Sequence, residues 1–221
     1  KMTESPTDEP DGLKIKFPVK RKDFRDFYEA AREALVFFDP IPNIKGHNLK
    51  IEPPTFSIGE DGDWGIIDDP RSLLSNSHYG GRRSANYVVM GNVKYNLDLS
   101  RLDDVPNIEG LVLFFDIGEI EPAASREEIR YKKHTKDAIQ KKINEISKVF
   151  TEEIQERIDE CDDRWDAALC LENFEAQLGR RARSLFTQAK KGLTYKGVPV
   201  TDLFHEDWVY DLGVSLHPYG F

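Results

Sequence analysis

The sequence is poor in residues that build disulfide or metal frameworks. It has only two cysteines, and its five histidines are scattered without an HExxH pattern or a Cys–His cluster, so we expect no metal site. Cys161 and Cys170 are nine residues apart on what the pattern predicts to be one helix. That spacing separates them by about 13 Å along the helix axis, too far for a disulfide, and indicates reduced thiols in a cytosolic protein.

Other absences limit the possible functions. No apolar run is long enough to cross a bilayer. A formal net charge of −9 makes a general nucleic-acid surface unlikely, because such surfaces need clustered Lys and Arg. Ser125 lacks a GxSxG context, and neither cysteine has a histidine nearby, so no nucleophile is predicted. What is present, 39% hydrophobic and 32% charged residues in a chain of 221, fits a soluble globular protein of one large or two small domains.

Apolar patterns predict strands in the first half of the chain. Residues 1–12 are polar and are expected to form a disordered leader. An amphipathic helix is predicted over residues 24–38, stopped by Asp39-Pro40. The expected strand elements are a strand over 13–19, a hairpin over 56–69 that turns at 59–63, a strand over 85–99 interrupted by Gly91-Asn92, and a buried strand over 110–118.

The apolar pattern of the second half of the chain predicts helices. Apolar residues recur in steps of three and four from Arg126 to Ile158, and a break is expected at 159–163 or at Gly179. A last helix over 180–190 precedes a short hairpin around Lys196-Gly197. Strands followed by long helices predict an α+β fold, a mixed sheet packed by helices, over residues 13–190. Residues 191–221 form a hairpin and tail that either complete this domain or begin another.

The segment Ser125-Arg126-Glu127 is the most informative local feature. It follows an apolar strand and an acidic-Pro turn, and it precedes the long helix. Ser125 suits a helix N-cap, and Glu127 and Glu128 suit the positive end of the helix dipole. Arg126 is therefore expected at a rigid corner at the start of the helix, where its guanidinium could grip an anionic group.

At this point the chain resembles the middle domain of GHKL-type ATPases, and in particular the phage rIIA-type lysis-inhibition proteins. The resemblance rests on DGLKIKFPV, DFRDFYEAAREALVFFDPIPNI, YVVMGNVKYNLDL and VLFFDIGEIEPAASREEIRY. It is also similar to the ninety-kilodalton heat-shock chaperones, in which an SRE arginine reaches the γ-phosphate of ATP. The resemblance implies a ribosomal-S5-domain-2-like fold and gives this role to Arg126. Arg130 falls where those chaperones have a supporting glutamine.

The resemblance also implies what lies outside this chain. No acidic-Asn helix, DxGxG turn or Gly-rich lid is present, so we expect an excised central portion that cannot hydrolyse ATP alone. ATP and Mg²⁺ would be bound by an adjoining domain. The family further implies an rIIB-type partner, a cytoplasmic location in the host cell with peripheral contact to the inner membrane, and a link to lysis inhibition.

Secondary candidate sites are basic. Arg82 and Arg83 follow two glycines and could contact phosphate, although a solvated loop is the simpler interpretation. Lys132 and Lys133 lie in RYKKHTK and could steer phosphates or an acidic partner. Basic residues at 180–183 give the last helix a face that could meet anionic lipid, although its apolar side is expected to pack in the core. The acidic group at 159–166 is expected to mark a helix break or a solvated face.

The alternative to an ATPase domain is a non-catalytic module that binds a protein or a membrane. In that case Arg126 would be a structural ion-pair residue at the helix start. The two hypotheses differ in whether its guanidinium is offered to a phosphate or held by acidic neighbours.

Overall fold

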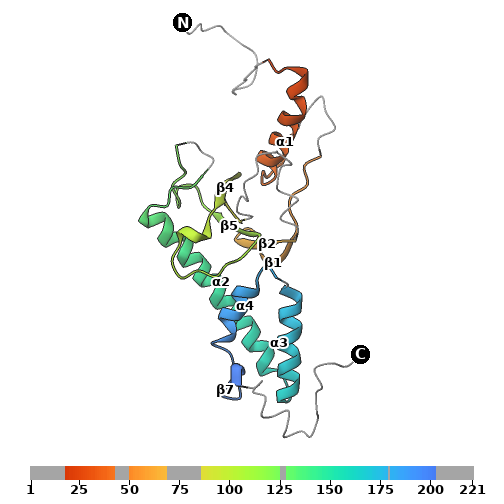
Figure 1. Ribbon diagram of the computed structural model, residues 1–221, viewed down its shortest axis with the longest axis vertical. Helices are drawn as coiled ribbons and strands as arrows, with labels where there is room; N and C mark the ends of the chain where they lie inside the picture. Colours follow the sequence, from red (N-terminus) through yellow and green to blue (C-terminus); the bar gives the residue numbers. More distant parts are fainter. Residues whose placement is uncertain (1–17, 43–49, 69–85, 125–127, 179, 203–221) are drawn as a thin grey trace.

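The computed structural model describes residues 18–42, 50–68, 86–124, 128–178 and 180–202 (Figure 1). Five strands of this part form one sheet in the order β1-β2-β5-β3-β4. Neighbouring strands are antiparallel except β3 and β5, which are parallel. The strands are β1 (Phe56–Glu60), β2 (Trp64–Ile67), β3 (Asn86–Met90), β4 (Val93–Leu97) and β5 (Leu111–Phe115).

The remaining described elements are helices and short segments. They are η1 (Arg21–Asp23), α1 (Phe24–Leu35), η3 (Leu99–Arg101), α2 (Lys133–Asp159), α3 (Arg164–Leu178), α4 (Arg183–Lys190), β6 (Thr194–Tyr195), β7 (Val198–Pro199) and η4 (Val200–Asp202). The predicted α+β class, helices on a mixed sheet, is confirmed. The parallel strands β3 and β5 are joined through β4 and η3 rather than through an α-helix. A ribosomal-S5-domain-2-like fold stays a prediction, and the strand expected over 13–19 lies mostly outside the described residues.

Glycines at two turns explain the two hairpins. The hairpin expected over 56–69 forms from β1 and β2, with Gly62 at φ 76° in its turn. The segment expected to be one interrupted strand is instead a second hairpin, in which Met90 pairs with Val93. Gly91 has φ 61° in this turn, a left-handed conformation that glycine adopts without strain.

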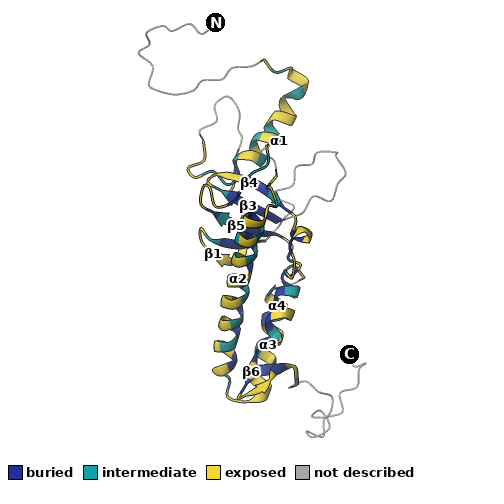
Figure 2. Cartoon of the chain, turned by 90° about the vertical axis from the view of Figure 1, so that its left-hand side faces the viewer, coloured by how far each residue is buried: buried dark blue, intermediate teal, exposed yellow. Residues whose placement is uncertain are grey.

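The apolar stripe of α2 forms the centre of the main core. Its residues Ile139, Ile143, Ile146, Phe150, Ile154 and Ile158 are all at most 3% exposed. They belong to one cluster with residues of the sheet, α3 and α4. Figure 2 shows the two sides of α2, buried toward its neighbours and exposed toward solvent. The predicted stripe is confirmed from Ile139 onward.

The chain breaks between α2 and α3, where a break was expected. Oδ1 of Asp163 accepts hydrogen bonds from the amides of Trp165 (2.8 Å) and Asp166 (2.9 Å), so this carboxylate caps α3. The prediction that both cysteines lie on one continuous helix is wrong, because Cys161 follows α2 and Cys170 lies in α3. Burial, and after it the neighbouring thiol of Cys170, raises the pKa of the free thiol of Cys161.

The last described residues pack into the same core. The expected helix over 180–190 is shorter, and its apolar residues Leu185 and Phe186 are 1% and 2% exposed. Core packing of this face, the preferred interpretation, is confirmed. Gln155 of α2 exchanges two hydrogen bonds with the backbone of Thr194, at 2.8 and 2.9 Å. The predicted hairpin at Lys196-Gly197, formed by β6 and β7, is therefore fixed against α2.

The amphipathic helix α1 contacts the sheet near its C-terminal end. Nζ of Lys94 lies 3.4 Å from Glu33, and Val36, just after the helix, is buried against the other face of the sheet. No residue of α1 is buried, and Phe24 and Phe27 are 53% and 47% exposed. Figure 2 shows α1 extending beyond the sheet with a largely exposed surface.

Candidate functional site

The site predicted from the sequence lies in the segment that joins β5 to α2. We call residues 121–124 and 128–130, which lie on either side of Arg126 in the chain, the strap. Its two sides are paired by backbone hydrogen bonds, from the amide of Ala123 to the carbonyl of Glu128 (2.7 Å) and from the amide of Arg130 to the carbonyl of Glu121 (2.8 Å). Pro122 and Ile129 form an antiparallel bridge, and Glu128 forms a parallel bridge with Asn96 of the edge strand β4. The two described sides of the strap are therefore paired with each other and attached to the edge of the sheet.

Buried residues and a tight turn fix the base of the strap. After β5 the chain turns at Asp116 to Glu119, and the amide of Asp116 donates to the Glu119 carboxylate at 2.8 Å. Ile120, directly before the strap, and Ile129, on its returning side, are each 2% exposed and belong to the main core. These two side chains hold the two ends of the strap against the body of the domain.

The strap changes the interpretation of Arg126. The prediction that the long helix begins at Arg126 with Ser125 as N-cap is wrong, because α2 begins at Lys133 with Lys132 as its N-cap residue. Residues 125–127 lie outside the described residues, so the position of the guanidinium stays a prediction. The described residues Ala123 and Glu128, which flank Arg126 in the chain, are paired to each other by a backbone hydrogen bond.

Acidic and basic side chains meet at the base of the strap. Nη1 of Arg130 lies 2.8 Å from Oε1 of Glu121, and Nζ of Lys132 lies 2.8 Å from Oε2 of the same carboxylate. The hydrogen bonds from Lys132 and then Arg130 lower the pKa of Glu121. The three side chains are between 33% and 58% exposed. The carboxylate thus neutralises part of a basic surface at the entrance to α2.

Neighbouring contacts fix the residues between strap and helix. The hydroxyl of Tyr131 accepts a hydrogen bond from the amide of Asp98 at 2.7 Å, and the guanidinium of Arg101 lies 4.8 Å from its ring centroid. Burial raises the pKa of Tyr131. The amide of Glu121 donates to Oγ1 of Thr135, which is fully buried, at 3.3 Å. The strap is therefore joined to η3 on one side and to the first turn of α2 on the other.

The structure brings some of the predicted site residues together and leaves others apart. Arg130 and Lys132 share one carboxylate, and Lys133 is exposed at the first position of α2. Arg82 and Arg83 lie outside the described residues. Glu121 was not predicted; its signal in the sequence was the acidic residue directly before Pro122.

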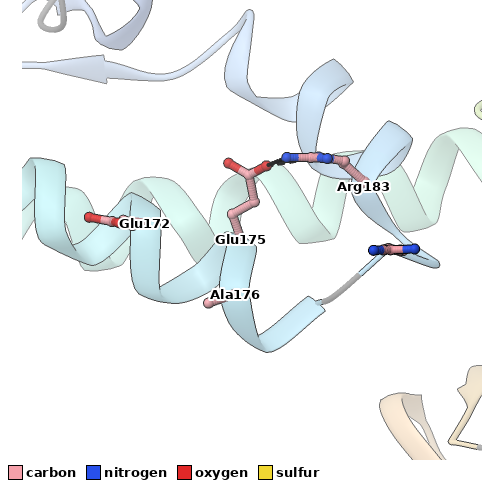
Figure 3. Close-up of a pocket in the computed structure, with 5 residues that line it drawn as sticks. Glu172, Glu175, Ala176 and Arg183 are labelled. Atoms are coloured by element: carbon pink, nitrogen blue, oxygen red, sulfur yellow. Dashed lines mark hydrogen bonds and ion pairs between the residues drawn. The ribbon is translucent and has the colours of Figure 1, made fainter. Parts of the chain in front are cut away.

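Arg181 and Arg183 are engaged within the fold. Nη1 of Arg181 donates to the backbone carbonyl of Ile67 at 3.0 Å, which ties the segment before α4 to the sheet. Nη2 of Arg183 lies 3.0 Å from Oε1 of Glu175, and Figure 3 shows these two side chains directed at each other. They line a shallow hollow of about 400 Å³ between α3 and α4, together with Glu172, Ala176 and Arg180. These contacts indicate a structural role for this cluster.

Within the described ranges, no group of three or more His, Cys, Asp or Glu side chains is arranged to hold a metal ion. No helix in the same ranges has both the length and the apolar character needed to cross a membrane. Comparisons of the chain with protein-family models, with curated proteins and with solved structures find no match.

Proposed function

We propose that the chain is the middle, or transducer, domain of an rIIA-like GHKL ATPase, and that it presents Arg126 to the γ-phosphate of ATP held by an adjoining domain. One observation carries the proposal. The residues on both sides of Arg126 are paired to each other, and this hairpin is attached to β4 and to the start of α2. A short, doubly anchored hairpin is a rigid support for a side chain that must reach into another domain.

The chemistry follows from the charge of the guanidinium. In phosphoryl transfer, negative charge on the equatorial oxygens is stabilised by a cation supplied from outside the nucleotide-binding domain. ATP and Mg²⁺ belong to the adjoining domain in this proposal, and this chain contributes the arginine and its support. Because α2 begins three residues after the strap ends, a displacement of the strap would act on one end of a 27-residue helix. Nucleotide state could reach the opposite end of the domain in this way.

The cellular part of the proposal rests on the sequence resemblance. It places the protein in the cytoplasm of an infected host cell, with an rIIB-type partner and peripheral contact to the inner membrane, in the control of lysis. The ribosomal-S5-domain-2-like fold is part of the same proposal.

A second function is favoured by α1. Its exposed Phe24 is a large apolar side chain that an interaction module would bury against a partner. In that case the strap would be a structural element and the chain would have no role in ATP turnover.

The proposal is tested in the full-length protein with Arg126→Ala. We expect ATP turnover to fall by about 10³-fold or more, with nucleotide affinity nearly unchanged, because the arginine acts on the transition state. Arg25→Ala is the matched control, since Arg25 is 79% exposed on α1 and pairs only locally with Glu29. Turnover equal to wild type in Arg126→Ala would remove the arginine from the mechanism and favour the interaction module.

A further inference from the structure

The backbone and side chain of Glu121 together connect both sides of the strap to the start of α2. Glu121 uses its backbone amide to contact Thr135 of α2 (3.3 Å) and its backbone carbonyl to accept from Arg130 (2.8 Å). Its side chain accepts from Arg130 at 2.8 Å and from Lys132 at 2.8 and 3.0 Å. We call Glu121, Arg130 and Lys132 the clamp. It joins the outgoing side of the strap, the returning side and the start of the helix.

We propose that Glu121 is the positioning residue of this site, and that Arg130 acts through Glu121 rather than on the phosphate. This inference rests on the proposed function of Arg126. It makes Arg130 part of the support of the strap. The sequence resemblance shows only that Arg130 occupies the position at which the chaperones have a supporting glutamine. The charged carboxylate keeps two cations at the base of the hairpin and leaves Arg126 as the residue offered to the nucleotide.

The geometry explains why such a clamp matters. A charged group that stabilises a transition state must be held to within about 0.5 Å of its productive position, and a displacement of about 1 Å can cost about 100-fold in rate. The two sides of the strap are joined by backbone hydrogen bonds at Ala123 and Arg130, and the returning side is bridged to Asn96 of β4. The two ion pairs of Glu121 add side-chain contacts at the base of the strap, which further restrict its displacement.

Removing the carboxylate has two local consequences. Arg130 and Lys132 become neighbouring like charges, which repel each other. Both cations also become available to the nucleotide, where they would compete with Arg126 for the same anion. The neutral isostere Glu121→Gln tests both effects, because it keeps the size of the side chain and the backbone contacts.

The first measurement is amide hydrogen exchange by NMR in the chain itself, and it does not depend on ATP. We expect the amides of Ala123 and Arg130 to exchange about fivefold faster in Glu121→Gln, the effect of losing exposed ion pairs of this kind. Glu145→Gln is the matched control, because Glu145 is an exposed residue that pairs with Lys141 at 3.7 Å on the outer face of α2. Exchange in Glu121→Gln equal to the control overturns the clamp.

The second measurement is ATP turnover in the full-length protein. We expect Glu121→Gln to lower kcat by about 10-fold to 100-fold with KM nearly unchanged. Glu121→Gln combined with Arg130→Gln should be no slower than the slower single variant, since both act on one contact. Additive losses would show that Arg130 acts independently of Glu121 and would overturn its assignment.

The outcomes separate this inference from the proposed function. Faster exchange with unchanged turnover in both Glu121→Gln and Arg126→Ala refutes the proposed function, and with it the positioning role, while the clamp remains a structural feature. Reduced turnover in Arg126→Ala, with wild-type turnover in Glu121→Gln, refutes only the positioning role.

Discussion

Replacing Asn86 tests how the sheet is assembled. Asn86 begins β3 and is 6% exposed. Its Nδ2 donates to the carbonyl of Ile108 at 2.7 Å, and its Oδ1 accepts from the amide of Leu111 at 2.9 Å. One side chain therefore fixes the loop that precedes β5 against β3, at the point where the two parallel strands start together.

Asn86→Ala removes both hydrogen bonds and leaves two backbone groups without their partner. Each buried polar group left unsatisfied costs about 1–3 kcal/mol. We therefore expect the free energy of unfolding to fall by about 2–5 kcal/mol, a large part of the total stability of a domain. Asn86→Asp should lose at least as much, because it keeps the acceptor but turns a carboxylate oxygen toward the carbonyl of Ile108.

Urea unfolding followed by tryptophan fluorescence and by circular dichroism measures this loss. Trp64, at 8% exposure on the neighbouring strand β2, reports on the sheet. Asn144→Ala is the control, because Asn144 is exposed on α2 and its removal should change stability by no more than about 0.5 kcal/mol. If Asn86→Ala matched this control, the hydrogen bonds of Asn86 would have no net role in stability.

Three further predictions follow from other contacts. Lys142→Met removes an ion pair of 2.6 Å with Asp63; it should cost about 1 kcal/mol, and urea unfolding should show a smaller difference from wild type at high salt. Phe174→Ala removes a ring packed edge-to-face on Phe150 at 5.7 Å between centroids; thermal unfolding should show a loss of about 3–5 kcal/mol, and Phe174→Leu a smaller one. The clamp lowers the pKa of Glu121 below its ordinary value of 4.5. A lowered folded-state pKa stabilises the fold above the unfolded value, and this contribution disappears as the pH falls through the folded value. The stability difference between wild type and Glu121→Gln, measured by urea unfolding, should therefore be present at pH 7 and absent in strong acid; a difference that persists there would contradict the ion pairs.

The sequence predicted those elements whose signals are local. The stripe from Ile139 to Ile158 and the turn at Gly62 depend on residues close together in the chain, and the structure confirms them. The expected break after Asp159 is also present. Asp163 marks it, because its carboxylate caps the N-terminus of the separate helix α3.

The start of α2 was mispredicted because long-range pairing overrides local preference there. Ser125 and Glu127 have the residue types of a helix N-terminus, whereas Lys132 has no side-chain capping bond and Lys133 puts a cation at the positive end of the dipole. The paired conformation is favoured over a longer helix because Glu128 bridges Asn96, more than thirty residues away in the chain. No local pattern reports such a contact. The clamp was missed for the same reason, since it depends on the return of the chain to Glu121.

The order of strands in the sheet has a consequence for how the protein folds during synthesis. The pairs β1–β2 and β3–β4 are local hairpins, and each can close as soon as its residues leave the ribosome. The strand that unites them, β5, lies between β2 and β3 and is made last of the five. A nascent chain that stops before Leu111 thus has two isolated hairpins, each marginal in water. Addition of Leu111–Phe115 converts them into one sheet, on which α2 can then condense.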